Sequence, residues 1–357
     1  MSTIRFGIIG GGWRAQFFIR VAHALPDRFE VRSVLVRDPA KARVFAHRMN
    51  VTTCGSMDEL LADEALQYVV LSVPCAVHPQ LLGELAERRM PVLCETPPAR
   101  DVPAMEQVFA LKQRGLRIQV AEQLHLRPMH AARIALARSG LLGTVQQAQV
   151  AIAHGYHGIS LIRRLLGITF QDVTITARRV SSTILAGPGR EGPPTEERTE
   201  QVMQELGWLD FGGRLGVLDF APPQYFSYIR GTRMLVQGDR GEICNDELRY
   251  LKDFRTPIRV KLRREAAGED DNLEGCYFKG IQAGDQWVYV NPYVPGRLSD
   301  DEIAVASCLD KMAQYVQGGA EFYGLAEACQ DHYLARLLSD AARTGEARVS
   351  QRQVWAS

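Results

Sequence analysis

The stretch Phe6-Gly7-Ile8-Ile9-Gly10-Gly11-Gly12-Trp13-Arg14-Ala15 decides the fold, because a short apolar strand breaks there into three glycines and resumes as a helix. Its spacing reads G-x-G-x-x-A. Gly10 allows a tight strand-to-helix turn, Gly12 lets the backbone approach a pyrophosphate closely, and the small Ala15 lets helix and strand pack together. The helix that follows points its N–H groups and its positive dipole end at the phosphates. Glycine clusters also occur in ordinary turns, so the surrounding pattern must decide between the two interpretations.

That surrounding pattern favours a dinucleotide-binding turn. Thr3 to Ile9 alternate as a buried strand, and Gln16 to Leu25 carry apolar side chains at helical spacing. A second strand, Val31 to Val36, ends about 20 residues after the turn, as a nucleotide-binding βαβ unit requires. The cofactor-contacting residues predicted in this turn are Gly10, Gly12, Trp13 and Arg14.

Composition limits the possible functions. The chain has 357 residues, 46% of them hydrophobic, which is enough for two hydrophobic cores. With 42 basic and 41 acidic residues its formal net charge is +1, so there is no electrostatic reason for binding nucleic acid or an anionic membrane surface. Neither an N-terminal signal sequence nor an apolar run of about 18 residues is visible in the sequence. We expect neither nucleic-acid nor membrane partners.

The seven cysteines are scattered, odd in number and never arranged as C-x-x-C. This distribution argues against a disulfide framework and against a zinc knuckle. The simplest interpretation is a set of reduced thiols in a cytoplasmic protein. His154 and His157 form an H-x-x-H pattern, but no adjacent carboxylate or cysteine completes a ligand set, so we predict no metal site.

Strands and helices alternate from the N-terminus to about residue 122, as in a doubly wound parallel sheet. Tyr68 to Val73 has no polar face, which is typical of a parallel strand covered on both sides. Beyond Gln123, strand-like segments separated by glycine turns favour a large, mostly antiparallel open sheet. We predict an α/β protein with an N-terminal Rossmann domain (1–122) that binds the nucleotide. A second α/β domain (123–357) would bind the substrate and form oligomers, with the active cleft between the two.

Polar residues stand at the carboxyl ends of the predicted parallel strands, where open α/β sheets bind ligands. Ser72, Pro74 and His78 follow one strand, and Glu95 ends the next. All four are candidate cofactor contacts, as is Gln123 at the junction of the domains. The alternative for Pro74 and His78 is a helix start and a histidine satisfied by its own loop. For Glu95, a carboxylate that binds ribose competes with a solvated loop charge.

The end of the second strand selects between NAD and NADP. An acidic side chain there binds the adenosine ribose of NAD and repels the phosphate of NADP. Val36 occupies that position, and the neighbouring Arg37 has a guanidinium suited to a phosphate. We therefore predict NADP as the cofactor, with NAD possible if Asp38 takes the acidic role.

These residues, with further motifs, resemble the glucose-fructose oxidoreductase and inositol dehydrogenase family (Gfo/Idh/MocA) over nearly the whole chain. The further motifs are Cys94-Glu95-Thr96-Pro97, where the family usually has E-K-P, Gly140 to Val145, Gly155-Tyr156-His157, and Ser339 to Gly345. The resemblance implies NAD(P)-dependent oxidation or reduction of sugars, cyclitols and related small molecules. It also implies a second domain whose open sheet often mediates oligomers, so we expect a homodimer or homotetramer.

Two positions depart from the family pattern. Thr96 stands where members usually have the lysine of E-K-P, and Ala153 replaces an aspartate four residues before the histidine. Threonine can donate a hydrogen bond near the cofactor but carries no charge. Of the three usual catalytic side chains only His157 remains, so His157 is the predicted proton donor, with Tyr156 and His154 as alternatives.

The leading hypothesis is an oxidoreductase that transfers a hydride between NAD(P) and a small carbonyl, sugar-like or cyclitol-like substrate. An alternative within redox chemistry is reduction of an imine or a conjugated double bond, which does not need the usual proton relay. A third hypothesis is a nucleotide-binding sensor or a non-redox enzyme that has lost the standard lysine and aspartate. Thr96 and Ala153 are the residues that distinguish these hypotheses.

Overall fold

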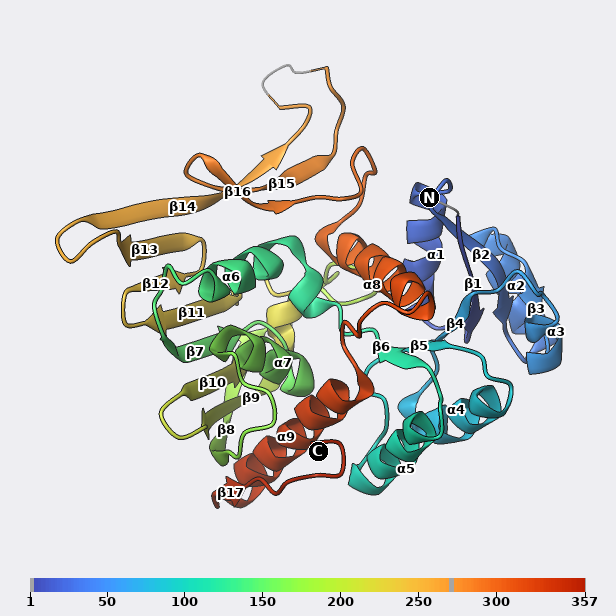
Figure 1. Ribbon diagram of the computed structural model, residues 1–357, viewed down its shortest axis with the longest axis horizontal. Coiled ribbons are helices and arrows are strands. Elements are labelled where there is room, and N and C mark those ends of the chain that lie inside the picture. The colour runs from blue at the N-terminus through green and yellow to red at the C-terminus, as the bar shows by residue number, and fades with distance from the viewer. Residues whose placement is uncertain (1–2, 270–272, 357) are drawn as a thin grey trace. The chain divides into compact units, whose positions relative to one another are not determined.

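The computed structural model describes residues 3–269 and 273–356 of the chain (Figure 1). The chain forms two compact units, each made of segments that are not contiguous in sequence. The first unit comprises Met1–Pro128, Glu265–Gly280 and Val290–Cys329, and the second comprises Met129–Arg264, Ile281–Tyr289 and Gln330–Ser357. A six-stranded sheet lies in the first unit, and most of an eleven-stranded sheet lies in the second.

The sheet of the first unit is parallel and has the strand order β3-β2-β1-β4-β5-β6. Strand β1 pairs with both β2 and β4, so the order reverses at β1. This is the strand order of a dinucleotide-binding Rossmann fold, and it confirms the predicted N-terminal sheet. The strands are β1 (Ile4–Ile9), β2 (Phe29–Leu35), β3 (Thr53–Cys54), β4 (Tyr68–Leu71), β5 (Val92–Cys94) and β6 (Ile118–Val120).

Helices follow these strands, and polar side chains cap several of their N-termini. The Ser56 hydroxyl accepts a hydrogen bond from the Glu59 backbone N–H at 3.2 Å and so caps the helix that begins at Met57. Asp101 caps another helix by accepting from the Ala104 N–H at 3.1 Å. The helices are α1 (Ala15–Ala24), α2 (Pro39–Met49), α3 (Met57–Leu61), α4 (His78–Glu87) and α5 (Val102–Gln113), and a 3-10 helix, η1 (Cys75–Val77), precedes α4.

Helix α8 (Asp300–Val316) belongs to the first unit, although it lies within the range 123–357. It packs on α1 and against β1 and β4. The Tyr68 hydroxyl on β4 donates to the Leu309 carbonyl on α8 at 3.0 Å. Arg28, just before β2, binds both carboxylate oxygens of Asp310 at 3.0 and 2.5 Å. A helix from late in the chain therefore covers part of the Rossmann sheet. A single domain boundary at residue 122 would assign this helix to the other domain.

The second sheet has eleven strands in the order β16-β15-β14-β13-β12-β11-β7-β10-β9-β8-β17. Strand β10 pairs in parallel with β7, whereas β9, β11, β12, β13 and β17 pair with their neighbours antiparallel. This mostly antiparallel sheet confirms the predicted C-terminal fold class. Strands β8 and β9 span 12 residues each.

The remaining elements complete this sheet and its cover. The strands are β7 (Val145–Ala151), β8 (Thr174–Leu185), β9 (Thr199–Asp210), β10 (Leu215–Phe220), β11 (Arg233–Gly238), β12 (Gly241–Cys244), β13 (Glu247–Leu251), β14 (Pro257–Ala266), β15 (Phe278–Ala283), β16 (Gln286–Val290) and β17 (Arg348–Val349). The helices are α6 (Pro128–Arg138), α7 (Gly155–Leu166) and α9 (Leu325–Thr344), and two 3-10 helices are η2 (Leu124–Leu126) and η3 (Pro222–Tyr225).

Helix α7 lies unusually close to β10, because glycines face both sides of the contact. A Cβ on Gly158 of α7 would lie 2.3 Å from the Leu218 side chain, and a Cβ on Gly216 of β10 would lie 2.5 Å from Ile162. Any larger residue at either position would push the helix away from the sheet. This contact fixes the position of the N-terminal turn of α7, where the predicted catalytic residues stand.

All seven cysteines carry free thiols. Burial raises the pKa of the Cys94, Cys308 and Cys329 thiols, which keeps them protonated and unreactive. Within residues 3–269 and 273–356, no helix has both the length and the apolar character needed to cross a membrane.

Candidate functional site

The two key glycines of the turn between β1 and α1 meet different requirements. Gly10 has a φ of 106°, and a Cβ there would lie 2.3 Å from the Ser72 carbonyl oxygen, so only glycine fits. A Cβ on Gly12, in contrast, would meet no atom of the described chain within 4 Å. The fold itself therefore does not require glycine at position 12. A ligand that must approach the backbone closely does require it.

Trp13 follows this glycine and is 44% exposed. Its ring packs edge-on against Phe17 of α1, with the ring centroids 4.7 Å apart. The indole therefore stands on the surface of the turn, held by the first turn of the helix.

The loop after β4 carries Ser72, Pro74 and His78. Ser72 is buried and its backbone N–H donates to Ile9 of β1 at 2.9 Å, whereas Pro74 is exposed. The His78 ring is buried, with Nε2 2.9 Å from the Val73 carbonyl and Nδ1 3.2 Å from the Pro98 carbonyl. Burial lowers the pKa of His78, although the two carbonyls oppose this shift, so the neutral ring is favoured. His78 thus ties the loops after β4 and β5 together.

Arg14 is the centre of a partly buried ion cluster at the carboxyl ends of β5 and β6. Its Nε donates to Glu95 Oε1 at 3.0 Å and its Nη1 donates to Asp301 Oδ2 at 2.7 Å. Its Nη2 donates to the Gln123 side-chain oxygen at 3.0 Å when that amide is oriented to satisfy its neighbours. Burial alone would lower the pKa of Arg14, but the carboxylates of Glu95 and Asp301 more than offset it and raise that pKa. The guanidinium stays charged and is held on three sides.

Asp301, at the start of α8, links this cluster to a second arginine. Its Oδ1 accepts hydrogen bonds from Arg127 Nε at 3.1 Å and Nη2 at 2.7 Å. Burial would raise the pKa of Asp301, but the charges of Arg14 and Arg127 outweigh it and lower the pKa. Two arginines and two carboxylates therefore form a neutral, mutually satisfied group. It connects the glycine turn, the end of β5 and the start of α8.

Sequence reasoning identified Arg14, Glu95 and Gln123 but missed Asp301 and Arg127. Asp301 stands in a first helical turn that contains three acidic residues after Ser299, whose hydroxyl caps the helix. Acidic residues are common in the first turn of a helix, because they interact favourably with the helix dipole. The sequence near Asp301 therefore gave no indication that this residue binds Arg14.

Thr96, in place of the usual lysine, is partly exposed beside this cluster. Its backbone N–H donates to Glu95 Oε2 at 3.2 Å. Glu95 therefore accepts one hydrogen bond on each carboxylate oxygen, from Arg14 and from Thr96. The strand end and its following residue are fixed by the same carboxylate.

At the end of β2, Arg37 is exposed and Asp38 has a structural role. Asp38 Oδ1 accepts hydrogen bonds from the backbone N–H groups of Ala40 at 2.9 Å and Lys41 at 3.1 Å, as the N-cap of α2. The bond from Lys41 is the main cause of a lowered pKa for Asp38. Arg37 and Asp38 are both exposed at this strand end, but the Asp38 carboxylate is engaged in capping.

The structure brings the three predicted catalytic residues together at the N-terminus of α7. His154 is the N-cap residue, and its carbonyl accepts from the His157 N–H at 3.1 Å. The ring of His157 lies 5.0 Å from that of His154 and 4.3 Å from that of Tyr156, centroid to centroid. His157 is buried and His154 is exposed. Ala153, fully buried, precedes this cluster.

Two further residues join the cluster from distant parts of the chain. The Tyr225 hydroxyl at the end of η3 lies 2.7 Å from His154 Nδ1 and accepts from the His154 backbone N–H at 3.2 Å. The His332 ring, on α9, packs edge-on against Tyr156 at 5.5 Å. No signal in the sequence identified either residue, because their proximity depends on the tertiary fold. Together with Phe220, they make an aromatic, histidine-rich surface.

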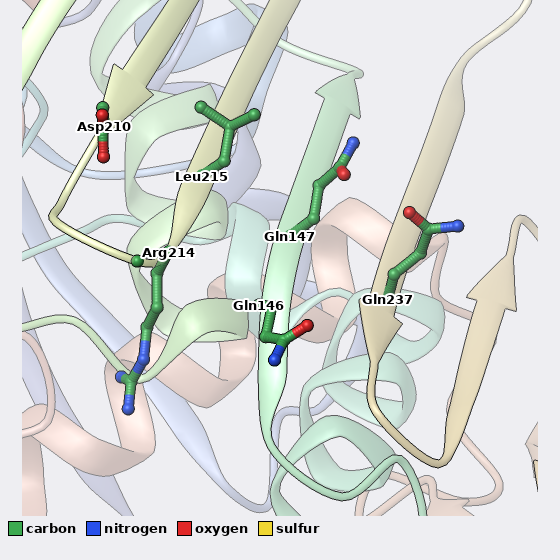
Figure 2. Close-up of a pocket in the computed structure, with 7 residues that line it drawn as sticks. Gln146, Gln147, Asp210, Arg214, Leu215 and Gln237 are labelled. Atoms are coloured by element: carbon green, nitrogen blue, oxygen red, sulfur yellow. The ribbon is translucent and has the colours of Figure 1, made fainter.

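Other features of the second unit are separate from this cluster. Figure 2 shows a pocket of about 400 Å³ on the eleven-stranded sheet, with side chains from β7, β9, β10 and β11. It is lined by Gln146, Gln147, Asp210, Gly213, Arg214, Leu215 and Gln237, none of which is a predicted site residue. In the described ranges, no group of three or more His, Cys, Asp or Glu side chains is placed to hold a metal ion.

A parallel sheet that reverses its order at β1, with a glycine turn directly after β1, defines a dinucleotide-binding protein of the Rossmann class. Residues 4–122 match the family model GFO_IDH_MocA, described as an oxidoreductase family with an NAD-binding Rossmann fold. The N-terminal part of the chain, residues 4–122, therefore matches the NAD-binding Rossmann domain of this family.

Similar proteins include oxidoreductases and dehydrogenases. The chain is 32% identical over 151 residues to the uncharacterized oxidoreductase ORF334 of Rhizobium meliloti, a match that covers 42% of this chain and 45% of the relative. It is 28% identical over 272 residues to the myo-inositol dehydrogenase Hyg17 of Streptomyces leeuwenhoekii, covering 67% of this chain and 82% of the relative. The match thus spans less than half of the first relative's length.

A solved structure of levoglucosan dehydrogenase in complex with NADH superposes with a TM-score of 0.70. The match covers 98% of this chain and 100% of that one, at 15% identity. At this identity the similarity shows a shared fold.

Proposed function

We propose that this chain is an NAD(P)-dependent oxidoreductase that transfers a hydride between the nicotinamide and a small carbonyl, sugar-like or cyclitol-like substrate. The observation that carries the proposal is the glycine turn, which has room for a ligand at Gly12 and adjoins Ser72 at the end of β4. The match of residues 4–122 to an oxidoreductase family with an NAD-binding Rossmann fold supports the cofactor class. The names of the relatives, myo-inositol and levoglucosan dehydrogenases, support the substrate class.

The residues described above fit such a cofactor. Gly10, Gly12 and the N–H groups at the start of α1 would hold the pyrophosphate. Trp13, Ser72, Pro74 and Thr96 would contribute the other contacts of the first unit, and Glu95 and Gln123 would contribute at the ribose or nicotinamide. Arg14 and His78 have their polar groups engaged inside the protein, so we propose that they position the turn and the strand-end loops.

We propose NADP as the preferred cofactor, with NAD possible. Two features support this choice: Arg37 is exposed at the end of β2, and the carboxylate of Asp38 is engaged in capping α2. A guanidinium there can bind the 2′-phosphate of NADP in a bidentate manner.

We propose His157 as the general acid, with Tyr156 and His154 as alternatives. A carbonyl that accepts a hydride becomes an alkoxide, which is too basic to form unless a donor protonates it as charge develops. Thr96 and Ala153 cannot take this role. An imidazole, which titrates near neutral pH, can. His157 is buried at the first turn of α7, so its ring is held in place for such a transfer.

A second candidate function follows from the same two substitutions. Neither Thr96 nor Ala153 supplies an ionisable group. This favours an enzyme that reduces an imine or a conjugated double bond. It equally favours an enzyme with a non-redox reaction, or a nucleotide-binding sensor without catalysis. The mechanism for sugar alcohols relies on groups that are missing here.

We also propose a cytoplasmic homodimer or homotetramer that forms through the open face of the second sheet. The side chains of Val180 on β8 and Trp208 on β9 are 44% and 41% exposed and both alternate away from the buried Ile175 and Leu209. Exposed apolar residues gathered on a sheet face are typical of interfaces. Light scattering at micromolar concentration that finds only monomers would remove the oligomer from the proposal and leave the fold unchanged.

The test of the main proposal has two parts. Calorimetry with NADPH and NADH measures cofactor binding, and NADPH oxidation is then followed with a panel of ketosugars, cyclic ketones and imines. Binding with turnover of a ketosugar or ketocyclitol supports the proposal, and turnover of imines alone supports the second candidate. Binding without any turnover indicates a sensor, and absence of binding contradicts both.

A further inference from the structure

The Tyr225 hydroxyl is placed to select one of the two neutral tautomers of His154. The Tyr225 oxygen accepts the His154 backbone N–H at 3.2 Å, and the same oxygen lies 2.7 Å from His154 Nδ1. A phenol that accepts from the backbone still has its own proton to donate. When the hydroxyl donates this proton to Nδ1 of the neutral ring, the imidazole proton is left on Nε2.

The same arrangement holds after His154 is protonated. The bond then reverses, with Nδ1–H donating to the Tyr225 oxygen, and Nε2 again carries a proton. In both charge states Nε2 is thus a hydrogen-bond donor. Without the phenol, the neutral ring could carry its proton on either nitrogen.

Among the described residues, the ring contacts of His154 come from three elements. On α7 these are Tyr156 and His157, with ring centroids at 5.2 and 5.0 Å. On β10 it is the apolar Phe220 at 6.2 Å, and on η3 it is Tyr225 at 6.0 Å. The titratable neighbours are therefore two tyrosines and one histidine, and no carboxylate is among these ring contacts. A buried histidine, His157, lies directly beside an exposed one.

We propose that Tyr225 is a positioning residue that keeps the proton of His154 on Nε2, so that His154 donates a hydrogen bond to an oxygen of the substrate at every working pH. The inference rests on the proposed function. It gives His154 the role of a hydrogen-bond donor to the substrate. The substrate class it selects carries a hydroxyl or carbonyl oxygen that can accept this hydrogen bond, and His157 remains the group that transfers the proton.

The proton position can be tested without any substrate. Imidazole ¹⁵N chemical shifts distinguish the two neutral tautomers, and the His154→Gln variant identifies the His154 signals. We expect the wild type to show the Nε2–H tautomer alone above its titration and the Tyr225→Phe variant to show exchange between both tautomers. Identical His154 spectra in wild type and Tyr225→Phe would overturn the proposal.

The functional consequence is tested by a double-mutant cycle. Tyr225→Phe should raise KM for an active hydroxylated substrate by about 10-fold, the value of one well-placed hydrogen bond, with a smaller change in kcat. His154→Gln should have an effect of similar size, and the double variant should be no worse than His154→Gln alone, because Tyr225 acts through His154. Additive losses would overturn this coupling.

A matched control is the neighbouring Tyr228, which is 75% exposed. Tyr228→Phe removes one hydroxyl from the same loop and should leave KM and the His154 spectrum unchanged. Melting temperatures of all variants detect any loss of fold. If the wild type turns over no panel substrate, the proposed function fails, while the ¹⁵N spectra still decide the tautomer proposal on their own.

Discussion

The two candidate clusters differ in the kind of side chain that builds them. In the first unit, Arg14 lies between the carboxylates of Glu95 and Asp301, and its pKa is raised while that of Asp301 is lowered. In the second unit, His154 and His157 lie among aromatic rings at the start of α7. The first cluster keeps its charges at any physiological pH. The second contains the side-chain type that changes its charge near neutral pH.

This difference suggests that the first cluster positions the cofactor-binding turn and that the second carries out proton transfer. Permanently charged, mutually satisfied groups fix a backbone turn without exchanging protons, which suits a cofactor site that must be the same in every turnover. Histidines and tyrosines can give and take protons, which suits the chemistry. Changes in the first cluster should therefore affect affinity and stability, and changes in the second should affect turnover.

The largest expected effect is on turnover, in the second cluster. His157→Ala should lower kcat on the order of 10²–10⁴-fold, the usual contribution of a general acid. Calorimetry should give a nearly unchanged dinucleotide Kd, because the ring belongs to the other cluster. Normal kcat in this variant would mean that Tyr156, His154 or the substrate itself supplies the proton. It would contradict the proposal that His157 is the general acid.

Next in size is the loss of cofactor binding when the space at the glycine turn is filled. Gly12→Val should weaken dinucleotide affinity by about 100-fold, because its side chain would occupy the position of the pyrophosphate. Since no protein atom lies near that Cβ, the melting temperature should stay close to wild type. Gly12→Ala provides a graded control with a smaller loss. Unchanged affinity in the valine variant contradicts the nucleotide site.

Removal of the Asp301 side chain tests how much the Arg14 ion cluster contributes to the free energy of unfolding. Asp301→Ala leaves the charge of Arg14 partly uncompensated and should cost about 3 kcal/mol of unfolding free energy, measured by urea denaturation. Asp58→Ala, which breaks an exposed pair with Arg88, is the control and should change little. An equal loss in both variants would mean that burial of the cluster does not matter.

The pH dependence of the same variant follows from the lowered pKa of Asp301. The carboxylate stabilises the fold fully above its unfolded-state pKa of about 3.9, and this contribution is lost as pH falls through the lower folded-state pKa. The difference in stability between wild type and Asp301→Ala should therefore be constant near neutral pH and shrink below about pH 4.

The smallest expected effect concerns the choice of cofactor. Arg37→Ala should weaken NADPH binding by about 10-fold and leave NADH binding nearly unchanged, because the guanidinium contacts only the additional phosphate. Arg114→Ala removes an exposed arginine beyond α5 and serves as the control. Equal losses for both dinucleotides would remove the basis for preferring NADP.

Much of the fold could be predicted because its signals are local. The glycine spacing, the apolar run of β4 and the change of pattern after residue 122 each depend on neighbouring residues. The candidate residues on β4, β5 and α7 could be identified in the same way, with support from the family resemblance. The partners of these residues could not. Asp301 resembles any acidic residue in a first helical turn, and Tyr225 comes from a loop 71 positions beyond His154.

The packing of α8 has a consequence for how this protein can be divided. The family model ends at residue 122, but β1 and β4 are covered by a helix that begins at Asp300, with Tyr68, Arg28 and Arg14 all bonded to it. A gene fragment cut at residue 122 would encode every nucleotide contact proposed in the Rossmann strands and still expose one face of their sheet. A chimera that joins residues 1–122 of this chain to a different C-terminal part must therefore also carry a matching α8.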